Sequence, residues 1–184
     1  MANLKHLEWF GPRGGPFEAE FGRHVVCWDK DSTLAHNAHR HHMVDAIRAG
    51  DKSITWDDYS AACAGDGVLT GAATALRLMQ GGGTRHFIIT GANASAHMHA
   101  AGWARRHCIP YDAMAMRAGG NHEPNPRLKI QAVHEIRKMM MIVDLFVEDW
   151  PQCARQIHEE TGVPTLTVNP NYEMDPRDGL AHVR

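Results

Sequence analysis

Four carboxylates stand in two close pairs, each at the end of a short apolar segment: Asp29 with Asp31, and Glu148 with Asp149. Crowded carboxylates repel one another and are costly to desolvate. A divalent cation would resolve that conflict. Mg²⁺ prefers hard oxygen ligands and keeps several waters, which leaves room for a substrate phosphate. If the two pairs meet in space, the residue types predict a magnesium site that handles phosphate.

A lysine in an apolar helical stripe is the next candidate. Residues 127–139 have the pattern of a helix in which Lys129, Val133, Ile136 and Met140 share one face. That face should point toward the core, where an ammonium needs an anion. We therefore expect Lys129 to bind both a phosphate and a carboxylate of the acidic site.

The strands and helices that must position these residues can be predicted from the alternation of apolar and helical segments along the chain. Five apolar, strand-like segments alternate with helical ones, and the strands are expected at residues 24–29, 86–90, 111–116, 141–147 and 163–168. This order predicts an α/β fold, a Rossmann-like, doubly wound parallel sheet of five strands. Ligands bind beyond the carboxyl ends of such strands, which is where the carboxylates lie.

The chain is expected to fold as a single main domain. Residues 1–22 are rich in Gly and Pro and predict an irregular N-terminal arm. Residues 23–170 form the expected α/β domain, in which about 34–83 includes a small helical cap. Residues 171–184 predict a loose C-terminal tail.

The segments around these residues resemble the motifs of the haloacid dehalogenase (HAD) superfamily. VVCWDKDSTL is similar to its first motif, FIITG to its second, Lys129 stands where the lysine of the third belongs, and FVEDWP is similar to the acidic fourth. The resemblance spans residues 24–168. More narrowly, TLAHNAHR, IPYDAMAMRAGGNHEPNPRLK and EDWPQ resemble the phosphatase domain of phage polynucleotide kinase and small phage-type relatives.

The resemblance implies a phosphatase that forms an aspartyl-phosphate, with roles for individual residues. Asp29 would attack phosphorus, and Asp31 would protonate the leaving oxygen and then activate water. Thr90 would bond a phosphate oxygen, and Lys129 would offset negative charge. The implied Mg²⁺ ligands are Asp29, Asp31 through its carbonyl, Glu148 and Asp149. The implied substrate-binding residues are Thr33, Gly91, Arg40 and Arg117.

Four positions depart from the pattern of these families. Lys30 stands between the two aspartates, where an uncharged residue is commoner, and Ser32 replaces a glycine. Ser32 is therefore expected to need a positive φ. Ala92 replaces an arginine frequent in close relatives, and Glu148 replaces a commoner aspartate. The catalytic set itself is complete.

Composition limits the possible classes of protein. The 184 residues are 43% hydrophobic and 22% charged, with a net charge of -2, and no apolar run is long enough to span a bilayer. We expect a cytoplasmic protein without a membrane partner. The four scattered cysteines predict reduced thiols, mostly buried.

The expected function is hydrolysis of phosphomonoesters, either nucleotides or 3'-phosphorylated nucleic-acid ends, by a nucleotidase or polynucleotide 3'-phosphatase. Two alternatives stay open. One is a catalytically degenerate binding module, which Lys30 and Ser32 motivate; the other is a metal-binding protein that uses the His-rich segment HNAHRHH, residues 36–42. Partners are the phosphorylated substrate and, as an open alternative, a second copy in a homo-oligomer.

Overall fold

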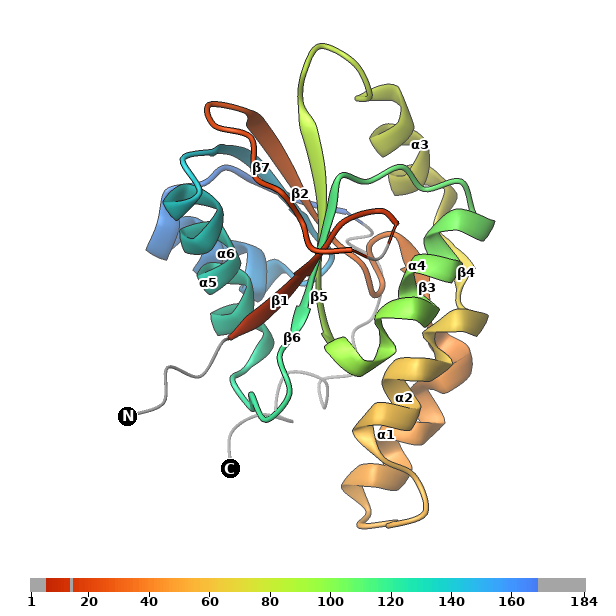
Figure 1. Cartoon of the computed structure of the whole chain (residues 1–184). Helices are drawn as coiled ribbons and strands as arrows, with labels where there is room; N and C mark the ends of the chain where they lie inside the picture. Colours follow the sequence, from red (N-terminus) through yellow and green to blue (C-terminus); the bar gives the residue numbers. More distant parts are fainter. Residues whose placement is uncertain (1–5, 14, 169–184) are drawn as a thin grey trace.

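A six-stranded sheet forms the centre of the molecule (Figure 1). The structure is a computed structural model and describes residues 6–13 and 15–168. The strand order is β1-β6-β5-β2-β7-β8. The bounds are β1 Leu7–Phe10, β2 His24–Asp29, β5 Arg85–Asn93, β6 Ala113–Arg117, β7 Ile142–Glu148 and β8 Thr165–Thr167.

The five predicted strands are all present and pair in parallel, from β6 through β5, β2 and β7 to β8. The sixth strand corrects the sequence-based expectation. Part of the N-terminal segment expected to be irregular forms β1, which pairs antiparallel with β6 at the edge of the sheet. The predicted doubly wound α/β fold is confirmed, with one more strand than expected.

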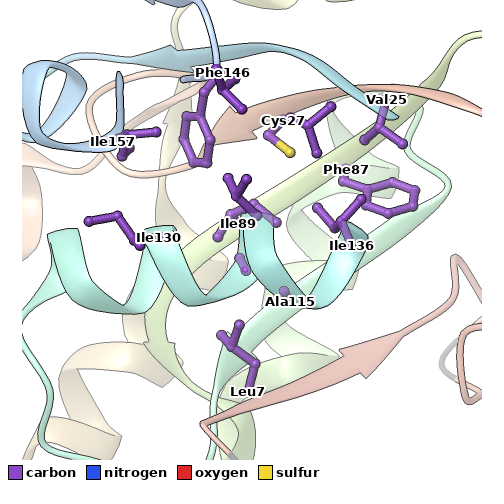
Figure 2. Close-up of a cluster of buried hydrophobic side chains, with 14 of the residues drawn as sticks. Leu7, Val25, Cys27, Phe87, Ile89, Ala115, Ile130, Ile136, Phe146 and Ile157 are labelled. Carbon is purple, nitrogen blue, oxygen red and sulfur yellow. The ribbon is translucent and has the colours of Figure 1, made fainter. Parts of the chain in front are cut away.

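Helices cover both faces of the sheet, as a doubly wound topology requires. Helices α5 (Asn125–Lys138) and α6 (Pro151–Thr161) cover one face, and α3 (Thr70–Leu78) and α4 (His97–Arg106) cover the other (Figure 1). Each side has its own apolar core. Figure 2 shows the first, where Ile130 and Ile136 of α5 and Ile157 of α6 lie against strand residues such as Phe146 and Phe87. In the second, Leu76 and Trp103 pack against Val26 and Trp28.

The segment between β2 and α3 forms the helical insertion expected from the sequence. It contains a short strand pair, β3 (Ala35–His36) with β4 (Gly67–Val68), the 3-10 helices η1 (Ala38–Arg40) and η2 (Ala62–Gly65), and helices α1 (His41–Arg48) and α2 (Trp56–Ala61). Helices α1 and α2 extend away from the sheet in Figure 1. Asp57 of α2 accepts hydrogen bonds from Asn93 and Ser95, so the insertion lies beside the carboxyl end of β5.

Two smaller expectations have different outcomes. Lys129, Val133 and Ile136 share the buried face of α5 as predicted, but Met140 lies beyond the end of that helix, has a φ of 59° and is 67% exposed. Of the four cysteines, which are all free, three are buried and Cys108 is exposed.

The expected C-terminal tail, residues 171–184, lies outside the described residues. In the described part of the chain, no helix has the length and apolar character needed to cross a bilayer.

Candidate active site

Three carboxylates meet at the carboxyl edge of the sheet. Asp29 and Glu148 are the last residues of β2 and β7, which are neighbouring parallel strands, and Asp149 follows directly. One carboxylate oxygen of each residue lies within 4.8 Å of the others. Asp29 and Glu148 are buried, and Asp149 is partly buried. Parallel pairing therefore brings together two segments that are more than a hundred residues apart in the sequence.

Lys129 supplies the positive charge at this cluster. Its ammonium Nζ lies 2.7 Å from Asp29 Oδ1 and 2.6 Å from Glu148 Oε2, and the side chain is 5% exposed. Burial alone would lower the pKa of Lys129, but Asp29 and Glu148 together raise it well above its usual range. The first turns of α5 thus hold a permanent cation against the end of β2.

One ammonium does not balance three carboxylates. Burial raises the pKa of Asp29 to about 7 and that of Asp149 to about 9, and the neighbouring negative charges add to both shifts. The three carboxylates offer hard oxygen donors that converge from two strand ends, which is the donor set that Mg²⁺ prefers. The residues therefore fit a divalent cation of this kind.

Two hydroxyls complete the rim. Thr33, which is fully buried, donates a hydrogen bond to Asp149 Oδ1 at 3.3 Å. The Thr90 hydroxyl accepts a hydrogen bond from the Ala92 backbone N–H at 3.1 Å, inside the part of β5 where its pairing register with β6 shifts.

Arg117 is the last residue of β6, and protein oxygen atoms surround its guanidinium. Its guanidinium donates to the Gly91 carbonyl at 3.0 Å, to the Glu123 carbonyl at 2.5 Å and to Asn125 Oδ1 at 2.7 Å. The side chain thereby connects β5 at Gly91 to the start of α5, the helix that carries Lys129. These contacts are all to protein groups, so the structure does not test the role in binding substrate expected from the sequence.

Asp31 lies outside the group of three carboxylates and belongs to a separate ionic cluster. Its Oδ1 lies 2.5 Å from the Arg40 guanidinium and 3.1 Å from the Lys30 ammonium. Burial alone would raise the pKa of Asp31, but Arg40 and Lys30 hold it below its usual range. Arg40 is 1% exposed. The structure therefore places Arg40 on the predicted acid–base residue, where the sequence suggested a contact with substrate.

Asp66 completes this ionic cluster and was missed by sequence reasoning. Its carboxylate accepts hydrogen bonds from Lys30 at 2.6 Å and from Arg40 Nε at 2.8 Å, and its side chain is fully buried. No motif includes Asp66. The one available signal was Lys30 itself, because a lysine inside an apolar motif requires a buried anion from elsewhere in the chain.

Ser32 adopts the conformation that its place in the motif predicted. Its φ is 65°, in the left-handed region. The loop around it is tight, since the Lys30 carbonyl accepts from both the Leu34 and Ala35 N–H groups. The Ser32 hydroxyl also donates to Asn37 Oδ1 at 3.2 Å.

The His-rich segment does not form a comparable ligand group. Within residues 6–13 and 15–168, the Asp, Glu, His and Cys side chains that converge in threes are Asp29, Glu148 and Asp149 alone. His41 instead contacts Asn37, and His39 Nδ1 lies 3.7 Å from Asp66 Oδ1.

No family model matches the chain, and no curated protein matches it. Solved structures do. A chain of the Pnkp1/Rnl/Hen1 complex is 18% identical with a TM-score of 0.66, over 82% of this chain and 48% of that one. A chain from the structure described as the Pnkp1/Rnl/Hen1 RNA repair complex is 15% identical with a TM-score of 0.63, over 91% and 46%. This chain therefore spans about half the length of those two.

A dehalogenase crystal structure is 12% identical with a TM-score of 0.54, over 91% of this chain and 93% of that one. At these identities the likeness concerns the fold. It agrees with the α/β fold that the sequence predicted.

Proposed function

We propose that this protein is a Mg²⁺-dependent phosphomonoesterase in which Asp29 is the nucleophile. The observation that carries the proposal is the convergence of Asp29, Glu148 and Asp149 within 4.8 Å, with the Lys129 ammonium on Asp29 and Glu148. A buried carboxylate beside a fixed cation and a metal-ligand set is suited to attack on a phosphate, whose own negative charge must be offset.

The residues present account for both half-reactions. An Asp29 carboxylate oxygen forms a bond to phosphorus as the bond to the ester oxygen breaks. Asp31, which must first take up a proton against the effect of Arg40 and Lys30 on its pKa, gives that proton to the ester oxygen. Asp31 then accepts a proton from water, which attacks the aspartyl-phosphate and releases inorganic phosphate. Lys129 favours the ionised form of Asp29 and offsets charge on the phosphoryl group. Mg²⁺, held by Asp29, Asp149, Glu148 and the Asp31 carbonyl, would supply further positive charge to the phosphate.

The proposed substrates are nucleotides or 3'-phosphorylated nucleic-acid ends. The support is the motif resemblance in the sequence, together with the similarity in fold to a chain of an RNA repair complex. Thr33, Thr90 and Gly91 lie at the carboxyl ends of the strands or just beyond them, where a phosphate would enter.

The decisive experiment is a phosphatase assay on the purified chain with Mg²⁺ and with chelator. The panel contains p-nitrophenyl phosphate, mononucleotides and oligonucleotides with a 3'-phosphate. We expect activity that disappears in chelator and falls by about 10³-fold or more in Asp29→Asn, since removal of a nucleophile has effects of this size. The melting temperature of Asp29→Asn serves as the folding control.

Two outcomes would contradict the proposal. Chelator-resistant hydrolysis, or hydrolysis that persists in Asp29→Asn, would place the chemistry elsewhere. A folded wild-type protein that cleaves nothing in the panel would favour the alternative of a degenerate binding module.

A further inference from the structure

We propose that Asp66 is a positioning residue for the reaction: it holds Arg40 and Lys30 against Asp31 and so aims the Asp31 carboxylate at the leaving oxygen. This inference rests on the proposed function. It assigns a role to a residue outside every motif of the sequence, and it gives a purpose to Lys30, the least usual residue of the first motif.

The cluster is a closed set of two cations and two anions. Both Asp66 oxygens are used, because Oδ1 accepts from Arg40 Nε at 2.8 Å and Oδ2 accepts from Lys30 at 2.6 Å and from Arg40 Nη2 at 2.9 Å. The same two cations bind one oxygen of Asp31. Hydrogen bonds between charged groups are the strong ones and impose geometry. Asp66 therefore determines where the two donors that grip Asp31 are located.

Because this cluster is largely buried, each of its charges needs a partner of opposite sign. The side chains of Lys30 and Asp66 are fully buried and that of Arg40 is 1% exposed, whereas the Asp31 side chain is 25% exposed. Asp31 is thus the member of the cluster that solvent reaches. Without the Asp66 charge, two buried cations would share one carboxylate, and the penalty for an unpaired buried charge would pull Asp31 toward them.

The remaining contacts of the two cations point to the same role. Arg40 Nη1 donates to the Tyr59 carbonyl at 3.4 Å, and the Arg40 guanidinium lies over the Tyr59 ring at 4.3 Å. The Lys30 ammonium lies 4.6 Å from the centre of the Trp103 ring. Both cations are held on several sides, which suits groups that orient a neighbour rather than groups that capture a substrate.

The backbone of Asp66 is itself well anchored. Its N–H donates to the Cys63 carbonyl at 3.2 Å, and its carbonyl oxygen lies 3.2 Å from His107 Nε2. The next residue, Gly67, pairs with His36 in the β3–β4 ladder. Asp66 is therefore a fixed point of the insertion, connected to the first motif through Lys30 and to η1 through Arg40.

The test is Asp66→Asn, assayed with two substrates that differ in leaving group. Phenyl phosphate needs a proton on its leaving oxygen, whereas p-nitrophenyl phosphate needs it much less. We expect kcat/KM for phenyl phosphate to fall by about 10²-fold, in the range that general acid catalysis contributes. For p-nitrophenyl phosphate the loss should be several times smaller. A merely structural role would lower both values by the same factor.

Asp112→Asn is the matched control. Asp112 also pairs with an arginine, Arg85, and accepts from a backbone N–H, but it lies at the amino end of β5, opposite the site. It should not alter the ratio between the two substrates. In an Asp31→Asn background, Asp66→Asn should add no further selectivity for the leaving group, because the residue it positions is already disabled.

Equal losses on both substrates, or none, in a folded Asp66→Asn protein would overturn the inference. If this variant does not fold, Asp66→Glu takes its place. It keeps the charge but lengthens the side chain by one methylene, and the same selective loss is expected; an unchanged ratio would count against the role. Wild-type protein that hydrolyses neither these two substrates nor the mononucleotides and 3'-phosphate oligonucleotides would instead overturn the proposed function.

Discussion

Ser32 shows how a single residue departs from a motif while the motif keeps its shape. A left-handed conformation costs a residue with a β-carbon about 1–2 kcal/mol relative to the right-handed one. Here the tight loop from Lys30 to Ala35 imposes that conformation, and the Ser32 side chain partly offsets it through its hydrogen bond to Asn37. The loop matters for function because it connects Asp29 and Asp31 to Thr33.

Substitutions at Ser32 should separate these contributions. Ser32→Gly removes the strain but also removes the hydrogen bond and adds freedom to the unfolded chain, so the free energy of unfolding should change by no more than about 1 kcal/mol. Ser32→Val places a β-branched residue at a φ of 65° and should destabilise the protein by about 2 kcal/mol or more. Urea unfolding of both variants is the measurement. Equal stability of the Gly and Val variants would show that the loop does not impose this φ.

At the scale of elements, the site depends on how α5 meets the irregular last part of β5, between Thr90 and Asn93. Arg117 of β6 bridges the two by binding the Gly91 carbonyl and Asn125 Oδ1. The approach is so close that a β-carbon on Gly91 would lie 2.3 Å from Asn125 Oδ1. The absence of a side chain at Gly91 therefore leaves room for the Asn125 amide, which accepts from Arg117 at the start of α5.

Gly91→Ala should disturb this junction. The Asn125 amide would have to move and give up its bond to Arg117, a hydrogen bond to a charged group, which contributes about 1.5–3 kcal/mol. We expect a loss of stability of that size by urea unfolding, because the Asn125 side chain no longer binds Arg117. The matched control is Gly102→Ala in α4, where open space surrounds the added carbon. That change should stabilise the protein by about 0.5–1 kcal/mol; a loss of stability similar to that of Gly91→Ala would contradict the account.

For the whole molecule, the acidic cluster couples folding to pH and to metal. The pKa values of Asp29 and Asp149 rise from an ordinary 3.8 to about 7 and about 9 in the metal-free fold. Between 3.8 and these values the folded chain binds more protons than the unfolded chain. The linkage relation then makes stability fall as pH rises through this window. Mg²⁺ binds the ionised carboxylates and acts in the opposite direction.

The melting temperature in chelator should therefore decrease from pH 5 to pH 9, and the increase caused by Mg²⁺ should grow over the same range. Because the fourteen histidines also titrate, the informative quantity is the difference between wild type and Asp149→Asn. That variant should lose most of the pH dependence above pH 7 and much of the Mg²⁺ effect. A melting temperature that rises with pH in chelator, or an identical pH dependence in Asp149→Asn, would contradict this prediction.

The sequence alone was enough to predict the alternating elements, the fold class and the strand ends at Asp29 and Glu148, because these depend on local patterns of apolar residues and on short motifs. The strand expected at 86–90 instead continues to Asn93, so Thr90 lies three residues before its end. Strand β1 was missed because an edge strand of four residues is stabilised by its pairing with β6, more than a hundred residues away. Asp66 was missed for the same kind of reason. The partner of a buried charge is chosen by proximity in space, so only the tertiary structure could connect Asp66 to Lys30 and Arg40, and Arg117 to Gly91 and Asn125.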